Sequence, residues 1–245
     1  MIPRQHPLAG PAILFASGGA RGHADENTVE AFHLARRLGA TGIESEVLLT
    51  ADGVPVLRRD ARIGGLRRRR VTDLDAADLP PEVVTLQRFY DEIGTDVQLL
   101  LHAPSTEAAD AALAVTTRHR ALDGLWLAAP SRPLLAAWRE RSTAARLIDS
   151  TPVRNMATGA ERHAAELREL RVDAVLLSQS EWSGGRTALF HRFGLRCFGT
   201  DAPHERMITA LLHIGLDGVV SAYPDRMVDA AAAIARPDAP DFLDG

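Results

Sequence analysis

The chain has 245 residues, a hydrophobic content of 46% and a formal net charge of −4 at pH 7. This length suits one well-buried domain, and the near balance of charge excludes an overall field that would attract nucleic acid or a membrane surface. The absence of any apolar run of 18 residues and of a signal-peptide layout, together with a single cysteine, predicts a cytoplasmic protein without a membrane span.

Short apolar stretches alternate with helical stretches along the whole chain. The apolar stretches have little polar alternation, which is typical of strands that are covered on both faces. The predicted strands are residues 12–17, 42–49, 97–101, 124–128, 145–148, 173–177, 195–198 and 218–221. The predicted helices are residues 28–38, 106–117, 133–141, 159–170, 187–193, 204–214 and 225–234.

Several strands are preceded by a similar phrase, in which an aspartate stands just before the apolar run. The phrases are Leu122-Asp123-Gly124, Val172-Asp173-Ala174 and Leu216-Asp217-Gly218. Eight such strand units in a chain of this length predict an α/β fold, a single (β/α)8 TIM barrel over residues 1–245, with an open doubly wound sheet as the alternative. In a barrel, the chemistry lies at the carboxyl ends of the strands.

The segment Gly42–Asp60 is the most informative part of the chain. It places Glu44 and Glu46 on one face of a predicted strand, because alternate residues of a strand point to the same side. A turn and a second strand follow, and they end at Arg59 and Asp60. The pattern predicts a pocket with two carboxylates and a nearby cation.

Four segments in order resemble the glycerophosphodiester phosphodiesterase family over nearly the whole chain. The first contains Glu26-Asn27-Thr28 before the first helix, and the second is Gly42–Asp60. The third is Thr85-Leu86 at the start of a helix, together with the strand at residues 97–101, and the fourth is residues 194–225. The resemblance implies hydrolysis of a glycerol phosphodiester to an alcohol and glycerol 3-phosphate. It also implies a Ca²⁺ or Mg²⁺ ion on three carboxylates and two histidines as general acid and base.

The chain departs from that family pattern at most catalytic positions. Ser17 and Arg59 stand at the two histidine positions, and Leu100 stands at the third carboxylate position. Neither a serine nor an arginine exchanges a proton near neutral pH. Because the loss of one acid or base costs about 10²–10⁴ in rate, we expect an impaired hydrolase. We expect Glu44 and Glu46 to hold a metal weakly or not at all.

Three functions remain open from the sequence. The first is an inactive homologue that binds a small phosphate-bearing or anionic ligand, and the second is a regulatory, partner-binding pseudoenzyme. The third is an active hydrolase with a shifted site that uses Glu44, Glu46 and His102, since His102 stands where the family has a lysine. His102 is therefore a candidate acid or base beside Ser17 and Arg59.

Anion contacts are predicted at Arg21 and Arg59, because arginine pairs bidentately with phosphate. Alternatively, Arg59 pairs internally with the two glutamates and fills the metal position with its fixed charge. Trp182, in the loop after the sixth strand, is a candidate substrate contact at the barrel mouth. The arginine-rich residues 58–70 are interpreted as a solvated loop, and we do not expect nucleic-acid binding because no aromatic residues are interleaved there.

Overall fold

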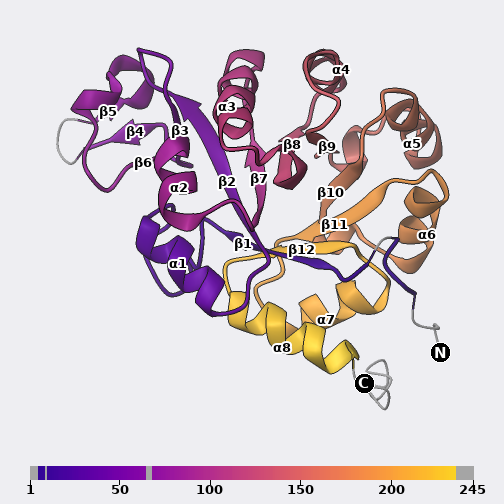
Figure 1. Ribbon diagram of the computed structural model, residues 1–245. Coiled ribbons are helices and arrows are strands. Elements are labelled where there is room, and N and C mark those ends of the chain that lie inside the picture. Colours follow the sequence, from indigo (N-terminus) through magenta and orange to yellow (C-terminus); the bar gives the residue numbers. More distant parts are fainter. Residues whose placement is uncertain (1–4, 9, 65–67, 236–245) are drawn as a thin grey trace.

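Eight parallel strands close into a barrel in the computed structural model, which describes residues 5–8, 10–64 and 68–235 (Figure 1). Each of the eight strands pairs with the next of them along the chain, and β1 pairs with both β12 and β2, so the barrel is closed. The predicted (β/α)8 barrel is confirmed. Its strands are β1 (Ile13–Ser17), β2 (Gly42–Leu49), β7 (Gln98–His102), β8 (Leu125–Ala129), β9 (Arg146–Asp149), β10 (Ala174–Ser178), β11 (Arg196–Thr200) and β12 (Gly218–Ser221).

The helices surround the strands, as Figure 1 shows. They are α1 (Val29–Arg37), α2 (Leu86–Ile93), α3 (Thr106–Arg118), α4 (Arg132–Arg141), α5 (Ala160–Glu169), α6 (Gly184–Arg192), α7 (Glu205–His213) and α8 (Pro224–Ala235). Helix α6 begins earlier than the predicted residue 187, because the hydroxyl of Ser183 accepts a hydrogen bond from the backbone N–H of Arg186 and caps the helix. None of the described helices combines the length and hydropathy that a membrane span requires.

An antiparallel excursion separates β2 from β7 and lies beside β2 at the upper left of Figure 1. Strand β3 (Pro55–Leu57) pairs with β2, and β6 (Val84–Thr85) pairs with β3, while β4 (Arg62–Ile63) and β5 (Arg69–Arg70) form a separate pair. Since β3 runs back along β2, the residues that follow β3 return to the carboxyl half of β2. The backbone N–H of Arg58 accordingly bonds to the carbonyl of Glu46 at 2.9 Å.

The arginine-rich loop is largely exposed to solvent, as its interpretation required. Arg62, Arg69 and Arg70 are exposed, and Arg68 forms an ion pair with the exposed carboxylate of Asp60. Arg67 lies outside the described residues.

Three hydrophobic clusters stabilise the described part of the chain, and the smallest, around Val56 and Val71, lies in the excursion between β2 and β7. The largest lies between the barrel and the helices, and the second fills the barrel interior. Leu100 is fully buried in the interior core, among Phe15, Trp126 and Phe198. Gly42 lies against this core so closely that a Cβ there would approach the Phe15 ring to 2.4 Å, so a larger residue would displace the ring.

Two of the three aspartates that precede strands have a common structural role. Asp173 Oδ2 accepts a hydrogen bond from the backbone N–H of Leu147 in the preceding strand, and Asp217 Oδ2 accepts one from Cys197 in the same way. The Asp173 carboxylate also accepts from Arg139 on α4, and the Asp217 carboxylate contacts His191 on α6. At these two positions, the repeated phrase in the sequence is therefore a clamp between adjacent strands.

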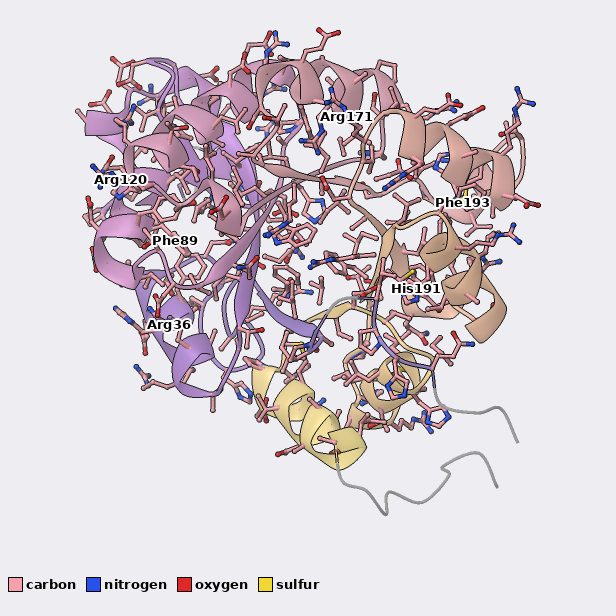
Figure 2. All side chains as sticks on the ribbon, turned by 45° about the vertical axis from the view of Figure 1, so that its right-hand side comes forward. Arg36, Phe89, Arg120, Arg171, His191 and Phe193 are labelled. Atoms are coloured by element: carbon pink, nitrogen blue, oxygen red, sulfur yellow. The ribbon has the colours of Figure 1, made fainter. Side chains whose placement is uncertain are left out.

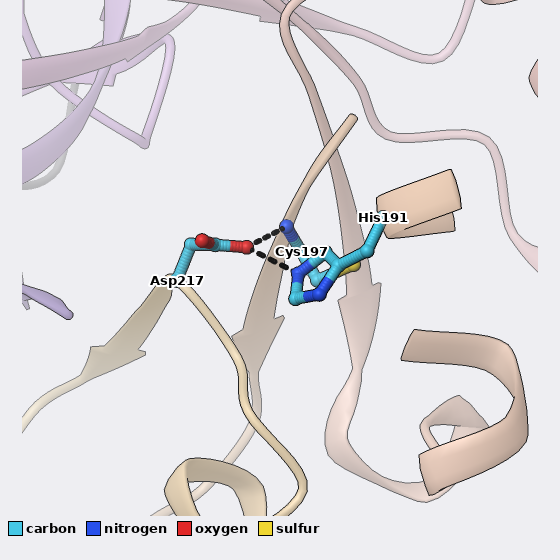
Figure 3. Close-up of side chains that lie close together, drawn as sticks. All are labelled: His191, Cys197 and Asp217. Atoms are coloured by element: carbon cyan, nitrogen blue, oxygen red, sulfur yellow. Dashed lines mark hydrogen bonds and ion pairs between the residues drawn. The ribbon is translucent and has the colours of Figure 1, made fainter. Parts of the chain in front are cut away.

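The second clamp brings together His191, Cys197 and Asp217, whose possible ligand atoms lie within 4.8 Å of one another (Figure 3). His191 Nε2 lies 2.7 Å from Asp217 Oδ2, and Asp217 Oδ1 accepts from the backbone N–H of Leu8 at 2.6 Å. Burial and the nearby Asp217 charge raise the pKa of the Cys197 thiol well above its usual value. The thiol is therefore protonated and the carboxylate already bonded, so this cluster is structural.

Candidate active site

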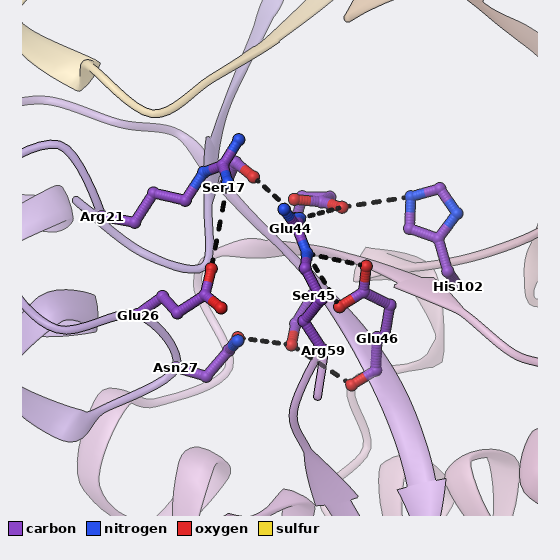
Figure 4. Close-up of polar contacts among 9 residues, drawn as sticks. All are labelled: Ser17, Arg21, Glu26, Asn27, Glu44, Ser45, Glu46, Arg59 and His102. Carbon is purple, nitrogen blue, oxygen red and sulfur yellow. Dashed lines mark hydrogen bonds and ion pairs between the residues drawn. The ribbon is translucent and has the colours of Figure 1, made fainter. Parts of the chain in front are cut away.

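Strand register brings four predicted site residues to one rim of the barrel. Ser17 ends β1 and lies opposite Glu44 of β2, while Glu46 lies opposite His102, the last residue of β7. Ser17 and His102 end their strands, and the register places Glu44 and Glu46 of the longer β2 beside them, at the rim where barrel enzymes carry out chemistry. Figure 4 shows Glu44 between Ser17 and His102.

Arg59 reaches into this group from the loop after β3. Its Nε lies 3.0 Å from Oε1 and 3.3 Å from Oε2 of Glu46, so it donates to both carboxylate oxygens. One terminal nitrogen lies 3.9 Å from Glu44 Oε1 and 3.5 Å from the hydroxyl of Ser17. The internal pairing of Arg59 with the two glutamates is thus present.

Glu44 is the most deeply buried charged group of the rim, with 4% of its surface exposed. Its Oε1 lies 3.1 Å from His102 Nε2. Its Oε2 has no hydrogen-bond partner among the described residues. A buried carboxylate oxygen without a partner is costly, so this atom is poised to accept a donor or a cation.

The pKa values of these groups reflect competition between burial and charge. Burial alone would raise the pKa of Glu44, but bonds and charges from His102, Ser17 and Arg59 together bring it below its usual value. For Glu46, burial and repulsion by Glu44 prevail over the attraction of Arg59, and its pKa is raised. Partial burial disfavours the charge on Arg59, yet the surrounding carboxylates raise its pKa further. The guanidinium is therefore a permanent cation.

The loop after β1 supplies a second arginine and an additional carboxylate. Arg21 lies 3.9 Å from Glu26, and both side chains are about two-fifths exposed, at 38% and 39%. Glu26 also contributes to the charge environment of Arg59, although sequence reasoning assigned it only to the motif before the helix. That motif is held by Asn27, whose side-chain oxygen accepts from the Ser45 hydroxyl at 2.6 Å.

Two hollows lie on this rim. One, of about 290 Å³, is lined by Ser17 and Arg21 together with Thr200, Asp201 and Ser221. The other, of about 240 Å³, is lined by Glu46, Arg59, His102 and neighbouring apolar residues. The predicted anion contacts Arg21 and Arg59 thus line different hollows.

Trp182 lies elsewhere than predicted. It is only 8% exposed, its Nε1 donates to the carbonyl oxygen of Phe198 at 2.9 Å, and its ring meets the edge of Phe190 on α6. The short helical turn Gln179–Glu181 carries the chain outward after β10, so the indole packs between the barrel and α6. It lines neither rim hollow.

Comparison with protein families gives one decisive match. The model of the glycerophosphoryl diester phosphodiesterase family matches residues 18–226. The chain belongs to this family. The rim residues Glu44, Glu46, Arg59 and His102 lie within the matched region, and Ser17 immediately precedes that region. Comparison with curated proteins yields no match.

Solved structures of family proteins have the same fold. The Oleispira antarctica phosphodiesterase, solved in complex with the product sn-glycerol-3-phosphate, has 20% identity and a TM-score of 0.80, with 91% of this chain and 97% of that chain covered. The Thermotoga maritima glycerophosphodiester phosphodiesterase has 20% identity and a TM-score of 0.78, with 90% and 99% covered. A provisionally named family protein from Silicibacter pomeroyi has 19% identity and a TM-score of 0.82, with 94% and 96% covered.

Proposed function

We propose that this family member does not catalyse metal-dependent phosphodiester hydrolysis and instead binds a small phosphate-bearing ligand at the barrel rim. The observation that carries the first half is the double contact of Arg59 with Glu46, with Glu44 only 3.9 Å from the same guanidinium. A cation of the protein itself stands among the carboxylates that the family uses for its metal.

The donor set does not fit a Ca²⁺ or Mg²⁺ ion as it is arranged. Both oxygens of Glu46 receive Arg59, and Leu100, opposite Glu44 in the neighbouring strand, offers no oxygen. The unpartnered Oε2 of Glu44 is the single group that favours a cation, but the positive charge of Arg59 opposes it. A hard cation needs free carboxylate oxygens, and Arg59 already occupies both oxygens of Glu46.

A general acid and a general base are also missing at the two positions where the family has histidines. Ser17 and Arg59 neither accept nor release a proton near neutral pH. The alkoxide that leaves a phosphodiester requires a proton donor, and without one the rate falls by about 10²–10⁴. These positions support binding rather than turnover.

Ligand binding is proposed for the hollow that contains Arg21. An anion in it would meet a partly exposed guanidinium that is held only loosely, 3.9 Å from Glu26, beside the lining residues Ser17 and Thr200. Forked guanidinium donors and hydroxyls are suitable partners for phosphate oxygens. The Oleispira antarctica relative binds sn-glycerol-3-phosphate, which makes glycerol 3-phosphate the first ligand to test.

The test combines turnover with binding. We expect no hydrolysis of glycerophosphocholine with added Ca²⁺ or Mg²⁺, and calorimetric binding of glycerol 3-phosphate that weakens about tenfold or more in Arg21→Gln. Arg37→Gln, an exposed arginine in the last turn of α1, is the matched control and should bind as the unaltered protein does. Metal-dependent turnover would contradict the loss of catalysis, and unaltered binding by Arg21→Gln would contradict the proposed contact.

The contact between Glu44 and His102 favours a second candidate, an active hydrolase with a shifted site. A histidine held 3.1 Å from a buried carboxylate is a common general acid–base arrangement, and this one borders the hollow beside Arg59. If this candidate is correct, glycerophosphocholine is turned over and the activity is lost in His102→Asn. Activity that persists in His102→Asn excludes it.

A further inference from the structure

The opposite end of the barrel contains a cavity of about 570 Å³ with four arginines on its wall: Arg146, Arg168, Arg171 and Arg196. We propose that this cavity binds a small oxyanion with two or more negative charges, of the phosphate or polyphosphate type. It lies where β9 and β11 begin, whereas the rim with Glu46 and His102 lies where strands end. The proposal is therefore independent of the rim.

Arg146 and Arg196 point into the barrel from the first positions of their strands. Ile148 and Phe198, two residues further along, belong to the interior core, and residues two apart in a strand face the same side. Their guanidinium carbons lie 4.9 Å and 5.5 Å from the centre of the Trp126 ring. Two like charges are thus held at one ring at the base of the barrel.

These charges are poorly compensated by the protein. Arg146 donates to neutral acceptors, the side-chain oxygen of Gln98 at 3.3 Å and the carbonyl of Asp123. Within residues 5–8, 10–64 and 68–235, no carboxylate lies within 4.0 Å of a nitrogen of Arg146 or Arg196. Burial and repulsion by Arg196 lower the pKa of Arg146, and they outweigh the more distant attraction of Asp173 and Asp123.

Arg168 and Arg171 add two exposed cations from the end of α5 and the turn that follows it. Arg171 is labelled in that turn in Figure 2. Neither has an ion pair in the described part of the chain. The one carboxylate on the cavity wall, Asp173, already receives Arg139 at 2.6 Å and the backbone N–H of Leu147 at 2.8 Å. The cavity therefore has a net positive wall.

The four arginines on the cavity wall favour a multiply charged anion as the ligand. Guanidinium groups form paired, charge-assisted hydrogen bonds with phosphate oxygens, and several of them around one cavity favour an anion with more than one charge. A monovalent anion such as chloride would satisfy only part of this wall. Pyrophosphate is a suitable probe because it is small and carries several charges.

The test is calorimetric titration of the full chain with pyrophosphate at constant ionic strength, with Trp fluorescence as a second readout because the cavity includes Trp126. We expect binding that weakens about tenfold or more in the double variant Arg168→Gln/Arg196→Gln. Arg192→Gln is the matched control, since this exposed arginine on α6 is paired with Glu161 outside the cavity. It should bind as the unaltered protein does.

Two further variants keep the result interpretable. Arg168→Gln alone removes an exposed side chain and should weaken binding even if the change at Arg196 impairs folding. Arg21→Gln serves as a background that removes the proposed anion contact of the rim hollow, and on this background Arg168→Gln should still weaken pyrophosphate binding. Absence of binding up to about 1 mM pyrophosphate, or equal affinity in the double variant and in Arg192→Gln, would overturn the proposal.

Discussion

Nε of Arg59 lies 3.0 Å and 3.3 Å from the two carboxylate oxygens of Glu46, so one donor is shared between both acceptors of the same side chain. A guanidinium keeps its charge over the whole range in which proteins are folded. The pair therefore persists wherever Glu46 is ionised, and it places a positive charge beside the buried Glu44.

Removal of Arg59 should create affinity for a divalent cation. In Arg59→Ala, Glu44 and Glu46 lose their shared cation, and their mutual repulsion favours Ca²⁺. We expect Ca²⁺ to bind at least about tenfold more tightly than in the unaltered protein by calorimetry. Arg58→Ala is the control, because Arg58 bonds only to backbone carbonyls of Asp60 and Arg62. Equal Ca²⁺ affinity in both variants would refute the assignment.

Acid stability should depend on the two rim glutamates in opposite directions. The pKa of Glu44 is lowered in the folded protein, so its contribution to the free energy of unfolding is present above its ordinary value of 4.5 and is lost as the pH falls through the folded value. Glu44→Gln should therefore lose less stability than the unaltered protein between about pH 5 and about pH 3.

Glu46→Gln provides the converse test. The pKa of Glu46 is raised, so its contribution is present at low pH and is lost as the pH rises through the folded value. Glu46→Gln lacks the stability that protonation of Glu46 adds on acidification. Its free energy of unfolding should therefore fall more steeply than that of the unaltered protein as the pH is lowered. Urea unfolding at several pH values measures both effects, and identical slopes in the two variants would show that neither assignment holds.

Ionisation of Tyr90 should lower the free energy of unfolding at alkaline pH. Tyr90 is buried, and its hydroxyl lies 3.1 Å from that of Thr116. Burial raises the pKa of Tyr90 to about 12. Its contribution to stability is present below about pH 10 and is lost as the pH rises through the folded value. Ultraviolet titration should detect a tyrosine with a pKa of about 12 that disappears in Tyr90→Phe and remains in Tyr223→Phe.

The clamp residue Arg139 should be important for stability. It is 7% exposed and donates to the carbonyls of Ser142, Ala145 and Arg171 as well as to Asp173. Arg139→Ala removes the guanidinium donor from the three carbonyls and leaves Asp173 with the Leu147 N–H alone among the described donors, and it should lower the free energy of unfolding by about 3–5 kcal/mol.

The neighbouring Arg141 is a matched control for that loss. It forms an exposed ion pair with Asp110 at 2.8 Å, and Arg141→Ala should cost less than about 1 kcal/mol. Chemical denaturation of the two variants measures the difference. Similar losses in both would mean that burial of Arg139 contributes little.

Local patterns in the sequence were sufficient for the barrel. Buried parallel strands are continuous apolar runs, so their number and approximate limits were visible. An error of a few residues arose at α6, where the cap residue Ser183 begins the helix before the predicted residue 187. Sequence reasoning predicted the place of Trp182 in the loop after the sixth strand but not the burial of its side chain, because an indole is suited equally to a ligand pocket and to the space beneath a helix.

What the sequence determined by itself was the fold, the family and the rim position of Ser17, Glu44, Glu46 and His102, since strand order and alternation decide which side chains share a rim. Only the tertiary structure decided that Arg59 binds Glu46. The return of β3 along β2 brings them together, and whether a guanidinium meets a carboxylate or a ligand depends on distance and burial in three dimensions.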